Sequence, residues 1–362
     1  MKKLIFILLI INLGCSSSND LQFINRFVDG NTKLLNIINN NDIQLKLTVI
    51  DSAENFVEHE YNIDTNKYFY PASTVKLPIA LFALEKLNEN KILSIDTPFM
   101  LEDDTLKTTF KNELEKVFIL SNNQSNNRFF EFIGQDYINK KFKAKGFFNS
   151  TIFHRLSTSN SSKLKGKRVD FFTNDSIISF QNNNKEPEKL RLKNIKKGKG
   201  YINSTGKMIK QEMDFSKKNY ISITDLHRIM KILFFPKKFK EEERFNLTNE
   251  QREILFNYMS GYPKDFGYNP DEFPHYFTKF FIYGDKELEL DENIIIYNKV
   301  GFAYGQLSDL AYIKKNNVSI ILTATIDVNT NKIYNDDKYD YDSIGFPFLA
   351  EISREIINRL SD

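Results

Sequence analysis

The order of hydrophobic patterns along the 362-residue chain is the feature that most constrains its fold. Alternation of apolar and polar residues over 43–49 predicts a half-buried strand near the start. Three more strands are expected near the end, at about 293–300, 308–314 and 318–328. Helical periodicity covers 21–40 and 348–360. Early and late strands can join one antiparallel sheet flanked by the terminal helices, which predicts an α+β fold.

The long middle of the chain is expected to form a second, helical subdomain. Apolar periodicity predicts helices over 71–88, 110–120 and 124–133. Ser222 and Thr248 have the character of capping residues that begin two further helices. Residues 157–220 differ, because they are rich in Lys, Asn and Ser. We therefore expect one domain over 21–362, with an α/β lobe (21–65 and 290–362) and a helical lobe (66–289) that contains a polar insertion at about 157–220.

The N-terminus has the pattern of an export signal. Two lysines precede a ten-residue apolar run, which is too short to span a bilayer as a helix. Leu13-Gly14-Cys15 resembles a bacterial lipobox, although Asn12 departs from the usual aliphatic residue. This predicts a signal peptide over 1–14, a lipidated Cys15 and a tether over 15–20, and hence a lipid anchor in the bacterial cell envelope. The alternative is an ordinary signal peptide with an incidental cysteine.

Composition excludes several classes of protein. Cys15 is the single cysteine, so no intramolecular disulfide and no Cys-based zinc cluster can form. Fifty Lys+Arg against 47 Asp+Glu give a net charge of +3, which argues against a dedicated nucleic-acid binder. Four scattered histidines lack metal-ligand spacing. We expect a monomer without metal or cofactor.

A serine followed three residues later by a lysine is the first candidate for chemistry. Ser73 and Lys76 would lie on one face of a helix, where the lysine can take the serine proton. Ser73 follows an aromatic-Pro-Ala turn and opens a strongly apolar helix, which distinguishes it from the other serines that have a lysine at this spacing. The spacing recurs in the polar insertion, at Ser162/Lys165 and Ser204/Lys207. Those two pairs are interpreted as chance.

Three motifs in order resemble those of the class A β-lactamase and penicillin-binding-protein superfamily of acyl-serine enzymes. The family pattern is S-x-x-K, S-D-N and K-T-G. The corresponding segments are Ser73–Lys76, Ser121-Asn122-Asn123 and Lys299-Val300-Gly301, and Asn127 follows the second at a spacing typical of the family. The order of elements also matches over roughly 21–360, so the resemblance implies the family's fold.

The resemblance also implies roles for these residues. Ser73 would attack a carbonyl and become acylated, Lys76 would act as general base, and Ser121 would relay protons. Asn123 would bind the substrate's amide, and Lys299 would place positive charge near its carboxylate. The backbone N–H groups of Ser73 and Phe302 would form the oxyanion hole, with Gly301 and Phe302 on the strand that binds substrate. The structural alternative is that Ser121 and Asn123 cap a helix and Lys299 is a solvated strand residue.

Two departures from the family pattern bear on turnover. Arg155 matches the arginine that precedes the omega-loop glutamate, but Ser157 stands near where that deacylating glutamate is expected. Glu186 and Glu188 are nearby in sequence without motif support, and His154 is either a base or a hydrogen-bonded loop residue. Val300 replaces the hydroxyl residue that would bind the substrate carboxylate.

The leading hypothesis is a Ser73 acyl-enzyme formed with a β-lactam or related amide, with slow deacylation. One alternative is a penicillin-binding, peptidoglycan-directed or other amide or ester hydrolase. Another is a non-catalytic envelope lipoprotein that holds a peptidoglycan-like ligand or a partner. The lysine-rich insertion could touch an anionic envelope surface, although a solvated loop is the simpler interpretation.

Overall fold

The structure is a computed structural model that describes residues 18–159, 161–286 and 288–361. The predicted signal peptide and Cys15 lie outside these residues. A five-stranded antiparallel sheet has the order β12-β13-β14-β1-β2. Its strands are β12 (Ile294–Ala303), β13 (Gln306–Lys315), β14 (Val318–Asp327), β1 (Asp42–Ile50) and β2 (Phe56–Tyr61). The sheet is thus built from both ends of the chain, as predicted, and β2 is a strand that the sequence pattern did not reveal.

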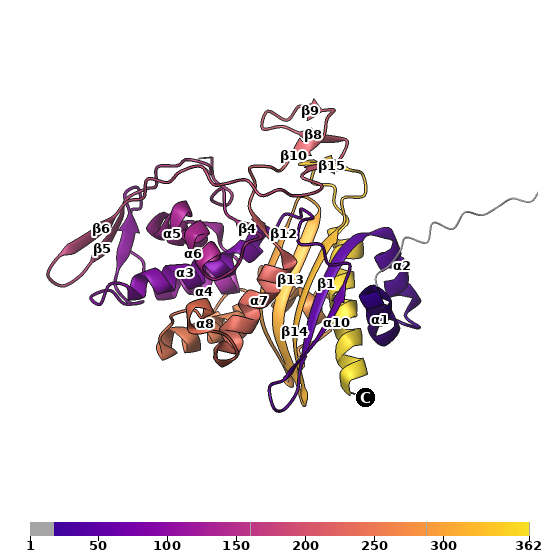
Figure 1. The fold of residues 1–362 in the computed structure, drawn as a ribbon. Coiled ribbons are helices and arrows are strands. Elements are labelled where there is room, and N and C mark those ends of the chain that lie inside the picture. Colours follow the sequence, from indigo (N-terminus) through magenta and orange to yellow (C-terminus); the bar gives the residue numbers. More distant parts are fainter. Residues whose placement is uncertain (1–17, 160, 287, 362) are drawn as a thin grey trace, which may run out of the picture.

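The terminal helices cover one face of this sheet (Figure 1). They are α1 (Ser18–Phe27), α2 (Thr32–Asn40) and α10 (Phe346–Ser361). Along β14, Leu322 and Ala324 point into the core beneath these helices, whereas Ile321 belongs to the core on the opposite face. The single helix expected over 21–40 is broken at Gly30, which has a φ of +81°. The Asn31 side chain then accepts a hydrogen bond from Leu34 N at 3.1 Å and begins α2.

The second face of the sheet carries α7 (Ile223–Phe234), which packs on β1, β13 and β14. Ser222 caps this helix as predicted, accepting from Asp225 N at 3.1 Å. His227 is fully buried between helix and sheet. Its Nε2 lies 2.7 Å from Thr48 Oγ1, and its Nδ1 lies 3.0 Å from Thr323 Oγ1. One histidine therefore ties α7 to two central strands.

The helical lobe lies beside the sheet (Figure 1). It contains α3 (Lys76–Asn88), α4 (Phe110–Ile119), α5 (Asn123–Ile133), α6 (Gln135–Ala144) and α8 (Asn249–Ser260), with Thr248 capping α8 as predicted. The helix expected from residue 71 begins only at Lys76. Ala72, at φ +46°, starts a 3-10 turn, η1 (Ala72–Val75), ahead of it. Almost every α3 side chain is buried, which makes α3 the centre of the lobe.

The polar insertion is not a bare solvated loop but a series of short paired strands. One small sheet joins β3 (Phe99–Leu101), β5 (Val169–Phe172) and β6 (Ile177–Phe180). Further pairs are β7 (Lys196–Lys197) with β10 (Met213–Asp214), and β4 (Ser150–Thr151) with β11 (Tyr220–Ile221). A third group combines β8 (Gly200–Ile202), β9 (Met208–Ile209) and β15 (Ile333–Tyr334). The middle of the chain is therefore helical with a β-structured extension that reaches over one end of the main sheet (Figure 1).

Short helical turns complete the chain. They are η2 (Pro236–Lys238), η3 (Glu241–Glu243), η4 (Pro263–Phe266), η5 (His275–Thr278), α9 (Phe280–Tyr283) and η6 (Tyr341–Gly345). In the described part of the chain, no helix has both the length and the apolar character needed to cross a membrane.

Candidate active site

Ser73 lies in the 3-10 turn that leads into α3, at the junction of the two lobes. The Thr74 hydroxyl donates to Pro71 O at 2.6 Å and closes the turn. Strand β12 runs directly alongside. A Cβ at Gly301 would lie 2.6 Å from Pro71 O and 2.8 Å from Ser73 N. Only glycine permits this approach, so the predicted third motif lies against the backbone of the first.

Ser121 links the two candidate lysines. It lies between α4 and α5 with a φ of +52°. Lys76 Nζ donates to the backbone carbonyl of Ser121, and it lies 3.2 Å from Ser121 Oγ. Lys299 Nζ, on β12, lies 2.8 Å from the same hydroxyl. Residues from α3, the α4–α5 junction and β12 therefore meet, as the resemblance implied, although the Ser121–Lys299 separation in sequence is 178 residues.

Burial changes the proton affinity of both lysines. Lys76 and Lys299 are 0 % and 1 % exposed. Burial, with Lys299 as a secondary cause, holds the pKa of Lys76 well below its usual value. Burial lowers the pKa of Lys299 to about 7, with Asp309 opposing the shift and Lys279 adding to it. A neutral amine is thus accessible near neutral pH, which is what a general base requires.

A buried polar cluster on the neighbouring elements surrounds Lys299. Lys279 Nζ donates to Met259 O at 2.6 Å and to Asn298 Oδ1 at 2.8 Å. Asn298 in turn donates to Asp309 Oδ1 at 2.9 Å. Burial lowers the pKa of Lys279 to about 7 and raises that of Asp309 to about 6. No motif pointed to Lys279, because its importance depends on how the residue that precedes α9 packs against β12 and β13.

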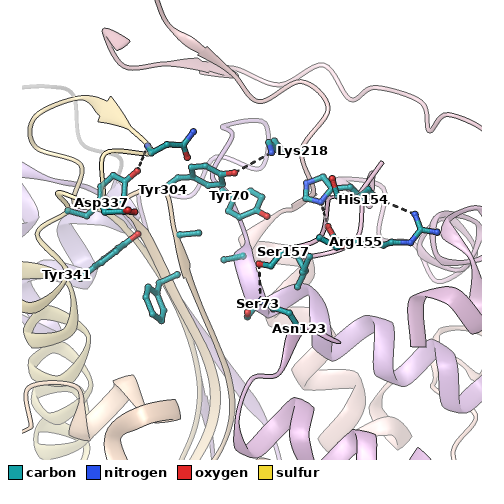
Figure 2. Close-up of a pocket in the computed structure, with 18 residues that line it drawn as sticks. Tyr70, Ser73, Asn123, His154, Arg155, Ser157, Lys218, Tyr304, Asp337 and Tyr341 are labelled. Carbon is teal, nitrogen blue, oxygen red and sulfur yellow. Dashed lines mark hydrogen bonds between the residues drawn. The ribbon is translucent and has the colours of Figure 1, made fainter. Parts of the chain in front are cut away.

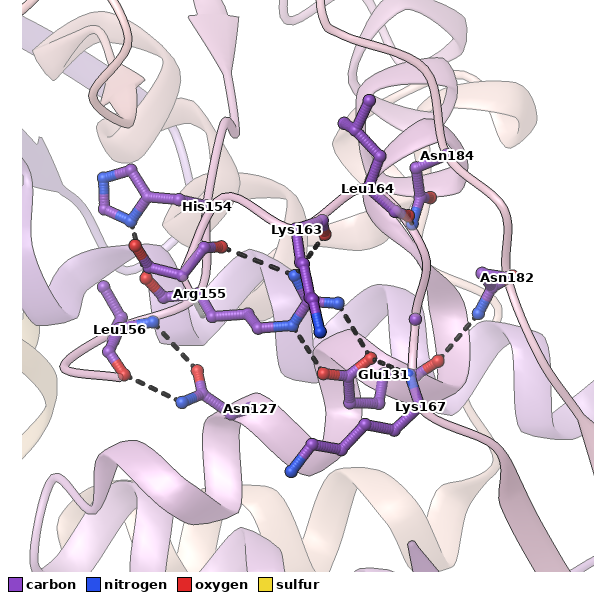
Figure 3. Close-up of polar contacts among 12 residues, drawn as sticks. Asn127, Glu131, His154, Arg155, Leu156, Lys163, Leu164, Lys167, Asn182 and Asn184 are labelled. Carbon is purple, nitrogen blue, oxygen red and sulfur yellow. Dashed lines mark hydrogen bonds and ion pairs between the residues drawn. The ribbon is translucent and has the colours of Figure 1, made fainter. Parts of the chain in front are cut away.

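Asn123 and Asn127 hold the segment that would carry the deacylating base. Asn123 Nδ2 donates to Ser157 Oγ at 3.0 Å. Asn127 exchanges two hydrogen bonds with the Leu156 backbone, at 2.8 and 2.9 Å (Figure 3). The Asn127 signal in the sequence therefore marks a tie between α5 and this segment.

An ion pair fixes the same segment from the other side. Arg155 binds Glu131 of α5 through Nε–Oε1 at 2.5 Å and Nη2–Oε2 at 2.9 Å (Figure 3). Both side chains are buried, and Glu131 also accepts from Lys167 N at 2.9 Å. Buried charges need such complete pairing. Arg155 therefore positions the loop and has no donor pair free for a ligand carboxylate.

The carboxylates considered as replacements for the omega-loop glutamate lie elsewhere. Glu186 pairs with Lys217 at 2.7 Å, and Glu188 pairs with Lys143 at 2.6 Å; neither glutamate lines the cavity at Ser73. His154 does line it. Its Nδ1 lies 2.6 Å from Arg155 O, and burial lowers its pKa to about 4, so the ring is neutral at pH 7.

A cavity of about 620 Å³ opens above Ser73 (Figure 2). Ser73, Asn123, Ser157 and Phe302 are among its lining residues, as are four tyrosines: Tyr70, Tyr304, Tyr339 and Tyr341. Lys76 and Lys299 lie below its surface. Val300 does not line the cavity, because its side chain is 3 % exposed and packs in the core beneath the terminal helices. Sequence analysis missed Lys218, which reaches the cavity from the end of the polar insertion.

Comparison with known proteins gives the same family as the motifs. A model of the Beta-lactamase enzyme family matches residues 31–360. Among solved structures, PBP-A is 14% identical with a TM-score of 0.55, covering 95% of this chain and 96% of that one. A β-lactamase from Chitinophaga pinensis DSM 2588 is 12% identical with a TM-score of 0.55, covering 91% and 98%. A class A β-lactamase from Clostridium kluyveri DSM 555 is 14% identical with a TM-score of 0.52, covering 95% and 100%. No curated protein matches the chain.

These low identities show a shared fold, whereas the family match extends over nearly all of the chain. The same fold joins a sheet made from both chain ends to a helical lobe, with Ser73 at their junction. The protein belongs to the β-lactamase enzyme family and is a serine hydrolase of the β-lactamase type.

Proposed function

We propose that the protein forms an acyl-enzyme through Ser73 with a β-lactam or a related amide, and that it releases the acyl group slowly. One observation carries the proposal above all others. Lys76 and Lys299 both contact Ser121 Oγ, at 3.2 and 2.8 Å, and Lys76 follows the half-buried Ser73 by three residues, about one helical turn. This arrangement provides a proton path and a buried base beside the nucleophile.

The acylation step follows from these contacts. Ser73 Oγ bonds to the amide carbonyl carbon and loses its proton to the neutral Lys76 amine. The C–N bond then breaks, and the leaving nitrogen takes a proton from the Ser121 hydroxyl, which Lys76 and Lys299 resupply. An ester on Ser73 and a free amine result, so atoms and protons balance. The low pKa of the buried Lys76 supports its role as base.

The backbone N–H groups of Ser73 and Phe302 are assigned to the oxyanion hole. Support comes from Gly301, where a Cβ would lie 2.8 Å from both Ser73 N and Thr74 N. Strand β12 is therefore close enough for one of its N–H groups to share a carbonyl oxygen with Ser73 N. Fixed donors of this kind are often the largest single contribution to acyl transfer.

Slow deacylation is inferred from the residues that face Ser73. Ser157 stands where the family resemblance places the glutamate, and its hydroxyl is held by Asn123. Asp337 is the one carboxylate among the described residues that line the cavity, and it lies on the far wall from Ser157 (Figure 2). A neutral His154 with a pKa of about 4 is a weak base. A mutant of the structural neighbour PBP-A was solved as an acyl-enzyme complex with penicillin-G.

Intact-mass measurement with benzylpenicillin tests the proposal. We expect a stoichiometric mass increase equal to the whole penicillin, which persists for minutes or longer and is absent from Ser73→Ala. A short-lived adduct with rapid penicillin hydrolysis would contradict slow deacylation. No adduct with benzylpenicillin or a fluorophosphonate would contradict the acyl-enzyme and favour the binding lipoprotein.

The cellular location is also proposed from Cys15. The sequence around it supports a lipid anchor in the bacterial cell envelope. Metabolic labelling with a fatty acid should mark the protein, and Cys15→Ala should abolish the label and release the protein from the membrane fraction. Unchanged labelling in Cys15→Ala would contradict the anchor.

A further inference from the structure

Lys218 supplies the cavity with a cation that has no acidic partner. It lies between β10 and β11 at the end of the insertion, and its half-buried side chain lines the cavity. Its Nζ lies 3.3 Å from Tyr304 Oη and 5.5 Å from the centre of that ring. Among the described residues, no carboxylate forms an ion pair with Lys218, whereas the adjacent Lys217 pairs with Glu186 at 2.7 Å.

The second cationic side chain on the cavity wall is already committed. The Arg155 guanidinium is paired with the Glu131 carboxylate. Its Nη1 also donates to the backbone carbonyl of Lys163 at 2.7 Å. Lys218 is therefore the lining cation that remains available to a ligand. Figure 2 shows its ammonium near Tyr70 and Tyr304, with Ser73 lying below Tyr70.

Among the described residues that line this end of the cavity, His154 has a ring nitrogen without a hydrogen-bond partner. Its side chain is 7 % exposed, and its Nε2 has no hydrogen-bond partner. Because Nδ1 lies 2.6 Å from the carbonyl of Arg155, the proton belongs on Nδ1 and Nε2 presents a lone pair. A buried acceptor without a partner costs free energy unless a ligand or water satisfies it.

Aromatic rings enclose the space between these polar groups. Tyr70 stacks on His154 with ring centres 6.4 Å apart, and it meets Tyr304 edge-on at 5.0 Å. Asn123, the residue assigned to the substrate's acyl-side amide, is hydrogen-bonded to Ser157 on the same wall as His154. An acyl side chain bound by Asn123 would therefore extend along this wall toward Lys218.

We propose that this end of the cavity, formed by Tyr70, His154, Lys218 and Tyr304, is a subsite for a carboxylate on the acyl side of the substrate. The Lys218 ammonium binds the carboxylate, and the rings of Tyr70 and Tyr304 flank the group that bears it, with His154 stacked on Tyr70. The preferred substrates are amides with an anionic acyl group. This inference rests on the proposed acyl-enzyme, and it adds a selectivity that the family motifs do not contain.

Two penicillins that differ by one carboxylate test the subsite. Benzylpenicillin and its α-carboxy derivative, carbenicillin, are compared by their second-order rates of Ser73 acylation in the native protein, Lys218→Met, Lys218→Arg and the control Lys217→Met. We expect the native protein to favour carbenicillin by about tenfold, since a hydrogen bond to a charged group contributes this order of discrimination. Lys218→Met should lose that preference, whereas Lys218→Arg and Lys217→Met should keep it.

The outcomes separate the subsite from the acylation chemistry. Equal rates for the two penicillins in the native protein, or equal loss of preference in Lys218→Met and Lys217→Met, would overturn the subsite and leave the acyl-enzyme standing. If neither penicillin acylates Ser73, the proposed function fails. The subsite is then judged by equilibrium binding of phenylmalonate against phenylacetate, followed by tyrosine fluorescence because the chain has no tryptophan. Binding of phenylmalonate that is no tighter, or that is unaffected by Lys218→Met, would overturn it.

Discussion

Ser157 and Lys279 are single residues whose surroundings bear on the proposed acyl-enzyme. Ser157, at φ +47°, points its hydroxyl at Asn123 from a segment locked by Arg155 and Asn127. Lys279 lies behind the catalytic strand, where it is buried together with Lys299 and a single carboxylate, Asp309. Under the proposed mechanism, Ser157 affects the release of the acyl group from Ser73. Lys279 affects the charge of Lys299 during acylation.

Replacing Ser157 by glutamate should supply the missing base. A carboxylate on this rigid segment, beside Asn123, can activate water toward the Ser73 ester. We expect the Ser157→Glu acyl-enzyme with benzylpenicillin to turn over roughly 10²-fold faster, a typical contribution of a general base. Adduct lifetime by intact mass measures the effect, and the Ser73→Ala/Ser157→Glu double variant should form no adduct. An unchanged lifetime would show that Ser157 does not face the ester.

The pH dependence of acylation should report the charge of Lys299. Its pKa is lowered to about 7, so its positive charge is present below pH 7 and is lost as pH rises through that value. If that charge holds the substrate carboxylate, the acylation rate should fall above pH 7, approaching tenfold per unit at higher pH.

Removing Lys279 should change the pH at which the acylation rate falls. Lys279→Met eliminates a neighbouring cation that contributes to the low pKa of Lys299, so the fall in rate should shift to higher pH. The control is Lys286→Met, because Lys286 is half exposed and pairs with Asp342 at 2.8 Å. Coincident pH profiles for native protein and Lys279→Met would contradict the coupling, and a melting curve would identify simple loss of stability.

At the scale of elements, α3 and α5 carry Lys76 and Asn123 at their first residues, and the bodies of the helices hold the neighbouring loops and strands in place. Helix α5 holds the 155–157 segment through Asn127 and Glu131. Helix α3 brings Lys76 into contact with Ser121. Helix α7 supports the sheet whose edge strand, β12, carries Lys299. Buried polar contacts between elements therefore set the geometry of the cavity.

The contact of α7 with the sheet predicts a stability effect without an activity effect. His227→Ala would remove a fully buried ring and leave the hydroxyls of Thr48 and Thr323 without their partner. The cavity and the lost hydrogen bonds should lower the free energy of unfolding by about 2–5 kcal/mol. Chemical denaturation measures this cost, while the acylation rate should change little. His275→Ala, at a half-buried site whose ring contacts one backbone carbonyl, should cost less, and equal costs would contradict the bridging role.

At the scale of the whole molecule, one sheet and one helical lobe meet at Ser73, and the insertion covers one end of that junction. Lys197 pairs with Met213 across β7 and β10, and its ammonium binds Asp327 of the main sheet at 3.2 Å. The chain therefore leaves the fold at Lys197 and returns beside it at Met213, and we call the segment between them (198–212) the excursion. Lys218 lies outside this segment, between β10 and β11, so its position in the cavity does not depend on residues 198–212.

That excursion should be removable. Replacing residues 198–212 by an Asn-Gly turn preserves the Lys197–Met213 pair, because these residues are adjacent partners on antiparallel strands. We expect the shortened protein to fold, with a melting temperature a few degrees lower because Tyr334 loses its cover from β8, and to keep Ser73 acylation by benzylpenicillin within a few-fold. Loss of acylation in a folded protein would show that the excursion takes part in the reaction.

Much of the fold could be predicted because its signals are local. Period-two alternation identified β1, three further strands were expected near the C-terminus, and capping residues located α7 and α8. The insertion was harder, because its strands are only two to four residues long. Such short strands are stabilised by partners distant in sequence, as β8 is by β15, and they carry little periodicity of their own.

The sequence by itself determined the family and the order of the three motifs, since both depend on residue identity and spacing, and it is the basis for the proposal that Ser157 stands in place of the expected glutamate. Only the tertiary structure decided that Lys76 and Lys299 share Ser121, that Glu186 and Glu188 are paired with surface lysines, and that Lys218 enters the cavity without an acidic partner among the described residues. These facts depend on distances between residues far apart in the chain and on the burial that shifts their pKa values. Spacing along a sequence carries no information about either until the lobes have packed.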